Sequence, residues 1–445
     1  MNHPDLAIVI LAAGKGTRMK SALPKVLHKV GGFPMLLHVL DVAQKLGASR
    51  RIVVVGPGME AVEHAAMAFD PSCECVVQRE QLGTGDAVKA AKDALAGFTG
   101  TVLVLYADTP LISQVTLHEL LSTLEIYDIA VLGMQPRDPG AYGRLILNPE
   151  GDLTAIVEYK DATEEQRAIP LCNSGVMAVR NGRMFALLDE VKNDNAKGEY
   201  YLTDIVAGAM RHHLRCGVAE GKEEELLGIN SRQELAQGEY NFQQRRRAEL
   251  MENGVTLIDP SSVFFSADTE IGADTLIEPQ VFMGPGVMIG DGCHIKAFCH
   301  LEGATIGNRS TIGPMARLRP GAKLVRNNKV GNFVEIKNAT LHPGAQASHL
   351  SYLGDASIGA GTNIGAGTIT CNYDGFQKYK TTVGEGVFIG SNSALVAPVT
   401  IGDGAIVGAG SVITRNVPPG ALALSRPDQV EKPGWAEVFK AEHGE

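Results

Sequence analysis

The stretch MGPGVMIGDGCHIKAFCHL, residues 283–301, decides the fold of the second half of the chain. Its aliphatic residues Met283, Ile289, Ile295 and Leu301 stand six positions apart. A period of six fits neither an amphipathic helix nor an alternating strand. It is typical of a parallel β-helix, in which each hexapeptide forms one flat face and its aliphatic side chain points into a narrow core.

The six-residue period begins at residue 271, slips once, and returns after two interruptions. The predicted inward-facing residues are Ile271, Ile277, Met283, Ile289, Ile295, Leu301, Ile306, Ile312, Leu318, Leu324, Val330, Ile336, Val383, Ile389, Leu395, Ile401, Val407 and Ile413. The interruptions are residues 344–357 and 370–382, and the second contains Asn372, Tyr373, Asp374, Lys378 and Lys380. Because solenoids place insertions on one face, often the binding face, both segments are candidate ligand sites.

Residues 1–228 follow a different pattern. Short segments rich in Val, Ile and Leu predict strands at residues 7–13, 51–56, 101–108 and 129–134. Helix-like stretches lie between them, at residues 35–48 and 86–95. This alternation predicts a Rossmann-like α/β domain with a mostly parallel sheet, whose ligands bind outside the carboxyl ends of the strands. The loops after Ala13 and Tyr106 are therefore the candidate site.

A polar segment rich in helix formers, residues 229–252, separates the two patterns. It predicts a linking helix between a first domain, residues 1–228, and a second domain, residues 253–445. Three consecutive arginines at 245–247 lie in this helix, and we interpret them as a solvated face rather than a site for an anionic partner.

The composition sets limits on function. The chain has 445 residues and a formal net charge of −10, which argues against a general nucleic-acid-binding protein. The sequence contains no apolar run of the length, about 18 residues, that a transmembrane helix needs, and no basic region precedes the first apolar run. The seven cysteines are scattered, as in reduced cytosolic proteins. We expect a cytoplasmic protein that binds neither nucleic acid nor membranes.

The stretch VILAAGKGTRM, residues 9–19, is the first candidate for ligand chemistry. It lacks the third glycine of the dinucleotide fingerprint, and it does not fit the P-loop pattern. A strand followed by a glycine-containing loop, with Arg18 and the later Lys25, suits a triphosphate whose pyrophosphate is stabilised as it leaves. The alternative is a surface loop with incidental basic residues.

Several motifs extend this interpretation. They are LAAGKGTRM (11–19), LPKVL (23–27), QLGTGDA (81–87), YADTPL (106–111), YGR (142–144), IVEYKDAT (156–163), CNSGV (172–176) and GINSR (228–232). The motifs resemble those of the sugar nucleotidyltransferases. Over essentially its whole length, the chain resembles the bacterial family that joins a uridylyltransferase domain to a left-handed β-helix acetyltransferase in UDP-N-acetylglucosamine synthesis.

Asp108 ends a predicted strand at the ligand edge of the sheet, where a carboxylate can hold Mg²⁺. The alternative is a turn aspartate before Pro110. The resemblance implies that Asn230 shares this metal and that Lys25 and Arg18 act in catalysis. The nucleotide and sugar contacts that it implies are Leu11, Ala12, Ala13, Gly14, Lys25, Gln78, Gly83, Thr84, Tyr106, Ala107, Asp108, Gly143, Glu158, Asn173 and Asn230. Asp86 and Ala107 depart from the family pattern, which often has His and Gly there.

The second domain has its own candidate residues. His349, in SHLSYLGD (348–355), is the candidate base, because an imidazole can accept the proton that an amine loses when it attacks a thioester. The resemblance implies contacts to glucosamine 1-phosphate from Arg319, Lys337, Tyr352, Asn363, Asn372 and Tyr373. It implies contacts to acetyl-CoA, the co-substrate, from Ala366, Asn372, Tyr373, Ser391, Ala409 and Arg426.

The resemblance therefore implies a bifunctional, homotrimeric enzyme. It would acetylate glucosamine 1-phosphate and then transfer UMP from UTP to the product with Mg²⁺, supplying peptidoglycan and lipopolysaccharide precursors. One alternative is a monofunctional nucleotidyltransferase whose β-helix only forms trimers. Another is a non-enzymatic scaffold, which the presence of Lys25 and Asp108 disfavours.

Overall fold

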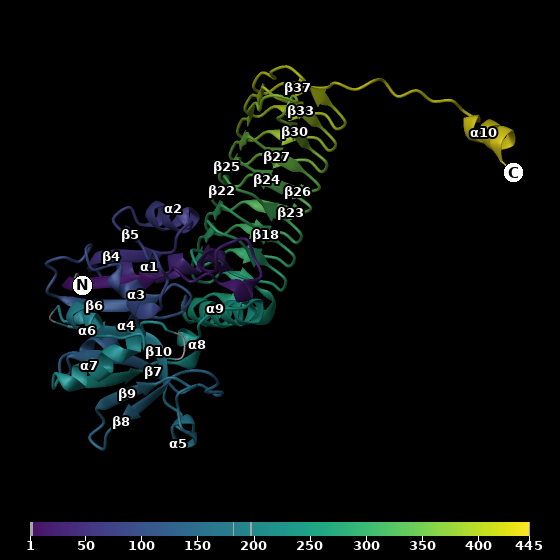
Figure 1. The fold of residues 1–445 in the computed structure, drawn as a ribbon. Helices are drawn as coiled ribbons and strands as arrows, with labels where there is room; N and C mark the ends of the chain where they lie inside the picture. Colours follow the sequence, from purple (N-terminus) through teal and green to yellow (C-terminus); the bar gives the residue numbers. More distant parts are fainter. Residues whose placement is uncertain (1–2, 181, 196–197, 445) are drawn as a thin grey trace. The chain divides into compact units, whose positions relative to one another are not determined.

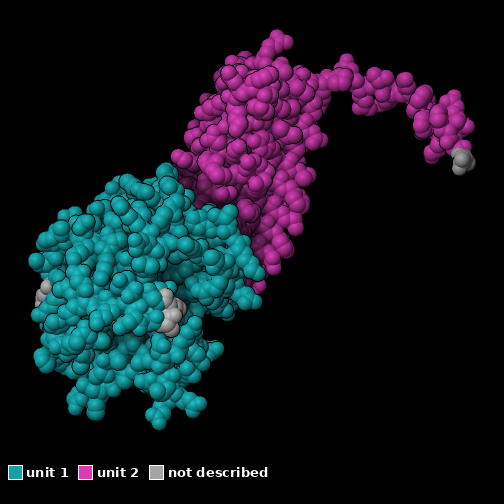
Figure 2. Space-filling view, in the orientation of Figure 1, with its two compact units in different colours: residues 1–244 teal, residues 245–445 magenta. Residues whose placement is uncertain are grey.

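The computed structural model describes residues 3–180, 182–195 and 198–444. The chain divides into two compact units, Met1–Gln244 and Arg245–Glu445, which have different colours in Figure 2. The division falls inside a continuous helix, α9 (Arg232–Glu252).

The first unit is built on a sheet with the strand order β11-β7-β10-β6-β1-β4-β5. Neighbouring strands in this order are parallel, except that β10 runs antiparallel to both β6 and β7. The strands are β1 (His3–Leu11), β4 (Ala48–Val55), β5 (Glu74–Val77), β6 (Thr101–Tyr106), β7 (Ile129–Met134), β10 (Cys172–Val179) and β11 (Cys216–Glu220). The hairpin β8 (Arg144–Leu147)–β9 (Leu153–Val157) joins the sheet beside β10, and β2 (Lys29–Val30) and β3 (Phe33–Pro34) form a separate two-stranded sheet. The prediction of a mostly parallel sheet is confirmed.

Helices cover both faces of this sheet (Figure 1). They are α1 (Met35–Lys45), α2 (Glu60–Phe69), α3 (Thr84–Lys89), α4 (Gln114–Thr123), α5 (Glu164–Arg167), α6 (Met184–Asp189), α7 (Ile205–Arg211) and α8 (Glu223–Leu226). One buried cluster joins α1, α2 and α4 to Ile8 and Ile10 of β1, and a second joins α3, α6 and α7 to Ala7 and Val9. Residues 6–10 of β1 are buried on both faces of the sheet, which agrees with their continuous apolar sequence.

A helix was expected over residues 86–95, but α3 begins earlier, at Thr84, and ends at Lys89. Beyond it, the Ala91 and Lys92 amides donate to the carbonyls of Val88 and Lys89, both at 3.0 Å. These bonds reach back three residues, so the chain continues as tight turns rather than as an α-helix. The turns end near Gly97, whose φ is +75°.

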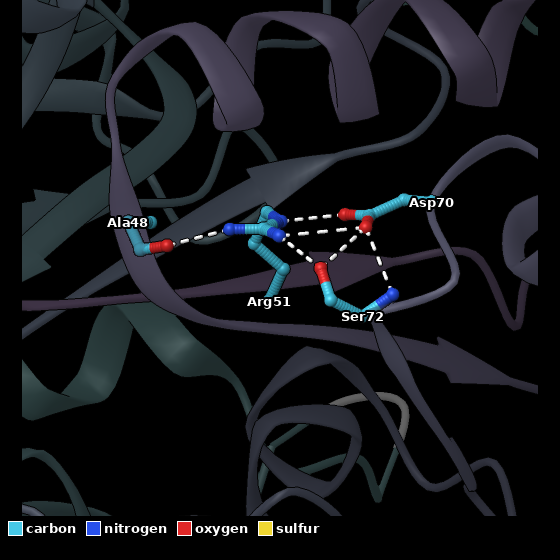
Figure 3. A network of polar contacts seen from close by, with 4 residues as sticks. All are labelled: Ala48, Arg51, Asp70 and Ser72. Carbon is cyan, nitrogen blue, oxygen red and sulfur yellow. Dashed lines mark hydrogen bonds and ion pairs between the residues drawn. The ribbon is translucent and has the colours of Figure 1, made fainter. Parts of the chain in front are cut away.

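A buried ion pair fixes the loop after α2 (Figure 3). Arg51 Nε lies 2.5 Å from Asp70 Oδ2, and Arg51 Nη1 donates to the Ala48 carbonyl at 2.6 Å. The Ser72 hydroxyl also donates to Asp70, at 2.6 Å. Burial by itself raises the pKa of Asp70, but the hydrogen bonds from Arg51 and Ser72 outweigh it and lower the pKa to about 2. The carboxylate is therefore ionised at neutral pH and holds β4 to the start of β5.

The second unit is a parallel β-helix with three sheets. The first sheet contains β12 (Thr256–Leu257), β14 (Leu276–Ile277), β17 (His294–Ile295), β20 (Thr311–Ile312), β23 (Lys329–Asn332), β26 (Gln346–His349), β29 (Asn363–Ile364), β32 (Phe388–Ile389), β35 (Ile406–Val407) and β37 (Leu422–Ala423). The second contains β15 (Phe282–Met283), β18 (His300–Leu301), β21 (Arg317–Leu318), β24 (Glu335–Lys337), β27 (Tyr352–Gly354), β30 (Ile369–Cys371), β33 (Ala394–Val396) and β36 (Val412–Ile413). The third contains β13 (Glu270–Ile271), β16 (Met288–Ile289), β19 (Ala304–Ile306), β22 (Ala322–Leu324), β25 (Thr340–Leu341), β28 (Ala356–Ile358), β31 (Thr381–Val383) and β34 (Val399–Ile401).

The predicted ladder of aliphatic residues forms the core of the β-helix. Ile277, Ile295, Ile312 and Val330 pair in register along the first sheet, and each is fully buried. The other predicted residues lie in the same cluster, with Ile271 half-buried against it. The predicted fold class, an α/β domain followed by a hexapeptide-repeat β-helix, is confirmed.

One of the two predicted interruptions is wrong. Within residues 344–357, Ala347 and Leu353 occupy core positions, and β26 and β27 pair with the coils on either side. The sequence hides this coil because Ala347 is too small to mark the period. The second interruption is real, since residues 372–380 leave the coil between β30 and β31. These nine residues are called the insertion loop below.

The interpretation of the three arginines at 245–247 as a solvated face is also wrong for two of them. Arg247 is buried and donates to the carbonyls of Val263 at 3.0 Å and Ser261 at 3.2 Å. Arg246 donates to the Thr269 carbonyl. Both side chains therefore hold the end of α9 to the first coil of the β-helix.

All seven cysteines are free thiols. Burial raises the pKa of several of them, for example Cys216 to about 12 and Cys299 to about 11, which makes these thiols poor nucleophiles. None of the helices in the described part of the chain has the length and apolar character needed to cross a bilayer. The described chain ends with α10 (Trp435–His443), on which Trp435 is exposed.

Candidate active sites

A cavity of about 430 Å³ lies at the carboxyl ends of β1 and β6. Many of the residues predicted to contact the nucleotide line this cavity: Leu11, Ala12, Ala13, Gly14, Lys25, Gln78, Gly83, Thr84, Tyr106 and Asp108. The position agrees with the rule that parallel sheets bind ligands beyond the carboxyl ends of their strands. Gln81 also lines the cavity, and its Nε2 donates to the Ala13 carbonyl at 2.7 Å. The sequence alone does not assign Gln81 to the site, because its φ of 52° and this contact arise only in the folded turn.

Three residues from distant parts of the sequence meet beside this cavity. Lys25 Nζ lies 2.5 Å from Asp108 Oδ2 and 3.0 Å from Asn230 Oδ1. The side chains of Lys25 and Asp108 are only 11% and 16% exposed, so little water screens their charges. The cluster places a cation and a carboxylate in the lining of the cavity.

Asp108 and Asn230 fit a magnesium site. No group of three or more His, Cys, Asp or Glu side chains suited to a metal occurs among the described residues. Mg²⁺ does not need one, because it commonly keeps several waters and uses one or two protein oxygens together with substrate phosphates. The carboxylate of Asp108 and the amide oxygen of Asn230 are oxygen donors that already converge on one cation, the Lys25 ammonium group.

The backbone around Asn230 is held by three kinds of hydrogen bond. The Ile229 amide donates to the Asp108 carbonyl at 2.9 Å, and Asn230 Nδ2 donates to the Gly228 carbonyl at 3.1 Å. Glu234 Oε2 accepts from the amides of Asn230 at 2.6 Å and Ser231 at 2.9 Å. These bonds orient the Asn230 side chain at the start of α9.

Gly16 determines how closely the loop after β1 approaches Lys25. Its φ is +59°, in the left-handed region that favours glycine, and a Cβ atom there would lie 2.5 Å from Lys25 Cβ. The loop packs directly against the stem of Lys25 as a result. A glycine in this position allows that contact.

Gln78 is buried in the wall of the cavity and makes two hydrogen bonds through one atom. Its Nε2 donates to the Gly83 carbonyl at 2.9 Å and to Asp86 Oδ2 at 2.8 Å. Asp86 is one of the two residues that depart from the family pattern. Its carboxylate also accepts from the Leu82 amide at 3.2 Å.

A second cavity of about 440 Å³ shares Thr84, Tyr106 and Glu199 with the first. It is lined by three further predicted residues, Gly143, Glu158 and Asn173. Burial, with a smaller contribution from Asp108, raises the pKa of the Tyr106 hydroxyl above its ordinary value, so it stays protonated as a hydrogen-bond donor. The two cavities are neighbours, because Thr84, Tyr106 and Glu199 line both of them.

Two predicted residues lie apart from this site. Arg18 is exposed on the 3-10 helix Thr17–Met19 and lies outside the described lining of both cavities. Ala107 is fully buried in the core, and its amide donates to the Leu11 carbonyl at 3.1 Å. Ala107 thus supports the lining strands from behind and presents no surface to a ligand.

In the β-helix, cationic side chains gather along one edge of the second sheet. Arg319 follows β21 and Lys337 ends β24, the next strand of that sheet. Lys378 of the insertion loop, followed by Arg319, lowers the pKa of the Lys337 ammonium group by charge repulsion. Glu335 Oε1 lies 2.7 Å from Arg319 Nη1 and offsets part of this charge. Such a cluster suits a phosphate group.

His349 is the last residue of β26, in the first sheet, at the corner from which the chain enters β27 of the second sheet. Its Nδ1 lies 2.7 Å from Asn332 Oδ1, and its imidazole is exposed. An amide oxygen only accepts hydrogen bonds, so Nδ1 carries the proton and Nε2 is left as the basic atom. The sequence alone does not point to Asn332, because only the pairing of β23 with β26 brings it to His349.

Four of the predicted acetyl-CoA contacts, Ala366, Ser391, Ala409 and Arg426, continue in a column from His349, whereas Asn372 and Tyr373 lie in the insertion loop. The core residues Ala347, Ile364, Ile389 and Val407 pair in register along the first sheet. Two positions after each stand His349, Ala366, Ser391 and Ala409. Arg426 extends the column, because its Nη1 donates to the Ala409 carbonyl at 2.6 Å. The column is a continuous track along one corner of the β-helix.

The remaining predicted residues lie near these two features. Tyr352 faces outward on β27, between the edge with His349 and the edge with the cations, and Asn363 lies on β29 beside β26. Asn372 begins the insertion loop, and its Nδ2 donates to Asp355 Oδ2 at 2.5 Å. Tyr373 follows it and is exposed. A cavity of about 670 Å³ between the insertion loop and the third sheet is lined by Lys323, Lys378 and Lys380, among other residues.

Comparisons with known proteins define the class of this chain. Residues 8–194 match the MobA-like NTP transferase domain, and residues 268–303 and 380–415 match the family described as bacterial transferase hexapeptide (six repeats). The chain therefore joins a nucleotidyltransferase domain to a hexapeptide-repeat transferase domain.

Full-length relatives define the family. The chain is 55% identical to the bifunctional protein GlmU of Paramagnetospirillum magneticum, across 99% of this chain and 98% of the relative. It is 58% identical to that of Rhodospirillum rubrum, across 98% and 97%, and 53% identical to that of Cereibacter sphaeroides, across 99% and 98%. The chain belongs to the bifunctional GlmU family, and it is an enzyme with nucleotidyltransferase and acyltransferase domains.

Proposed function

We propose that the second unit transfers an acetyl group from acetyl-CoA to glucosamine 1-phosphate. The first unit then transfers UMP from UTP to N-acetylglucosamine 1-phosphate and releases pyrophosphate. The observation that carries this proposal is the convergence of Lys25 Nζ on Asp108 and Asn230, at 2.5 and 3.0 Å, beside two neighbouring cavities. The product supplies the synthesis of peptidoglycan and lipopolysaccharide in the cytoplasm.

In the first unit, we place the substrate phosphates beside the charged side chains of Lys25 and Asp108. Asp108 and Asn230 would hold Mg²⁺, which would neutralise phosphate charge. Lys25 places its ammonium group against the triphosphate and stabilises the negative charge that develops on the leaving pyrophosphate. Gln78, Gly83 and Thr84 contact the nucleoside, and Gly143, Glu158 and Asn173 contact the sugar. The sugar phosphate oxygen attacks the α-phosphorus directly, so no covalent enzyme intermediate forms.

In the second unit, the Arg319 and Lys337 cations bind the phosphate of glucosamine 1-phosphate. His349 Nε2 accepts the proton of the sugar amine as its nitrogen bonds to the thioester carbon, and the carbon–sulfur bond breaks to release coenzyme A. The column from His349 to Arg426 holds acetyl-CoA. We also propose that the protein is a homotrimer. In it, the Arg319 and Lys337 cations of one copy would lie near His349 of a neighbouring copy.

The test uses paired assays on the same samples. Asp108→Ala is expected to lower uridylyl transfer at least about 100-fold and to leave acetyl transfer within about twofold of the original. His349→Ala is expected to have the opposite effect, because general-base catalysis contributes about 10²–10⁴-fold. The matched controls are Asp93→Ala and His300→Ala, which change exposed residues outside both sites.

Two outcomes would contradict the proposal. If both activities fall together in either variant, the division of labour between the units is wrong. If the unaltered chain shows no acetyl-CoA-dependent activity, it is a monofunctional nucleotidyltransferase with a β-helix that serves another purpose.

A further inference from the structure

The amide group of Gln78 can adopt only one orientation in this structure. Its Nε2 faces the Gly83 carbonyl at 2.9 Å and the Asp86 carboxylate at 2.8 Å. A carbonyl and a carboxylate both accept hydrogen bonds and cannot donate them. Rotating the amide by half a turn would place its oxygen against two other acceptors. The NH₂ group must therefore point at Gly83 and Asp86.

The Asp86 side chain is itself held in place, and it fixes the orientation of the Gln78 amide. It lies in the first turn of α3, half-buried, and Oδ2 also accepts from the Leu82 amide at 3.2 Å. Gln78 itself is 5% exposed and lines the cavity of about 430 Å³. Both of its N–H groups are occupied, which leaves Oε1 as the polar atom of this side chain that a ligand can use. Among the described residues, both hydrogen bonds of the Gln78 side chain run through Nε2, and neither involves Oε1.

We propose that Asp86 is a positioning residue that makes the nucleotide cavity selective for a pyrimidine with an N3–H group over cytosine. This inference rests on the proposed function, in which the cavity holds the nucleoside and Gln78 contacts its base. The N3–H of uracil can donate to a fixed Gln78 Oε1, whereas N3 of cytosine is an acceptor. Two acceptors facing each other in a buried site leave both groups unpaired, which lowers binding of the wrong base.

Removing the carboxylate should relax the choice of base. With the full chain, kcat/KM is measured for UTP and for CTP in Asp86→Ala and Asp86→Leu, with N-acetylglucosamine 1-phosphate as the acceptor. The ratio of the two values is expected to fall about tenfold in both variants, because the Gln78 amide can then turn its NH₂ group to the base. A purely structural role would lower both values and leave their ratio unchanged.

Two matched variants sharpen the test. Asp86→Asn keeps an oxygen acceptor, so its ratio is expected to stay within about threefold of the original. Gln78→Glu added to Asp86→Ala presents only acceptor oxygens to the base, so it should restore the preference for UTP. A ratio that stays within twofold of the original in both apolar variants would overturn the inference.

One measurement needs no variant. UTP methylated at N3 lacks the donor that Oε1 requires, and we expect it to bind the unaltered chain at least about tenfold more weakly than UTP. Equal binding of the two nucleotides would overturn the role of Oε1. A chain that transfers no nucleotidyl group from either UTP or CTP would instead contradict the proposed function itself.

Discussion

Gly16 controls the position of Lys25, and a single methyl group tests this. In Gly16→Ala, the new Cβ would lie 2.5 Å from Lys25 Cβ, closer than carbon atoms pack, in a backbone conformation with φ of +59°. Displacing Lys25 by a fraction of an ångström is expected to lower kcat/KM for uridylyl transfer about 10–100-fold. Acetyl transfer, measured on the same sample, should not change.

Gly97→Ala is the matched control. Gly97 has φ of +75°, so alanine there introduces similar backbone strain, but the space around its Cβ is open. This variant should lose about 1 kcal/mol of stability and keep both activities. Equal losses of uridylyl transfer in the two variants would show that strain, and not the contact with Lys25, is responsible.

Single residues could be predicted where a strand end or a motif marks them. Asp108 and the loop after β1 follow from the ends of apolar strands, and the structure places both at one cavity. Asn332 and the contact of Asp86 with Gln78 could not be predicted, because both depend on side-chain geometry that only the folded turns and coils create. Arg18 shows the converse, since its place in a basic motif does not bring it to the cavity lining.

The first turn of α9 positions Asn230 through a capping box. Ser231 Oγ accepts from the Glu234 amide at 3.2 Å, while Glu234 Oε2 accepts from the amides of Ser231 and Asn230. Glu234→Ala removes the bonds that Glu234 makes to the backbone of Asn230. The Mg²⁺ concentration for half-maximal uridylyl transfer is expected to rise about 10-fold, as for other residues that hold a metal ligand in place.

Glu234→Gln separates this effect from loss of charge. A glutamine completes the capping box as well as a glutamate does, so its Mg²⁺ requirement should stay close to that of the original chain. Glu249→Ala, on an exposed position of the same helix, controls for changes in helix stability. An unchanged Mg²⁺ requirement in Glu234→Ala would exclude a positioning role for this residue.

Whole elements were predictable where their periodicity is strong. The β-helix follows from aliphatic residues at every sixth position, and nearly all of them are buried. The coil around Ala347 escaped prediction because a small residue stands at its core position. The structural role of Arg246 and Arg247 could not be predicted, because the sequence shows their charge but not the backbone carbonyls that accept their hydrogen bonds. Pattern analysis detects core-facing apolar side chains, and it does not detect polar side chains that bond to the backbone.

Each buried cluster among the described residues lies within one of the two compact units. One cluster fills the β-helix, and the other two cover the faces of the sheet in the first unit. Stability in a domain comes mainly from burial of this kind. The division of the chain into two patterns, visible in the sequence, therefore corresponds to two separate sources of stability.

A pair of core substitutions tests this separation. Leu103 on β6 and Ile312 on β20 are both fully buried, one in each unit. Leu103→Ala and Ile312→Ala should each cost about 2–5 kcal/mol by leaving a cavity. In a unit of this size, such a loss lowers the unfolding temperature by about 5–15 °C. Unfolding is measured by calorimetry, and both activities are assayed after heating. Leu103→Ala should lose uridylyl transfer at a lower temperature than the original chain and keep its acetyl transfer. Ile312→Ala should lose acetyl transfer at a lower temperature and keep its uridylyl transfer. If either substitution lowers both inactivation temperatures equally, the units unfold as one and the separate cores do not act independently.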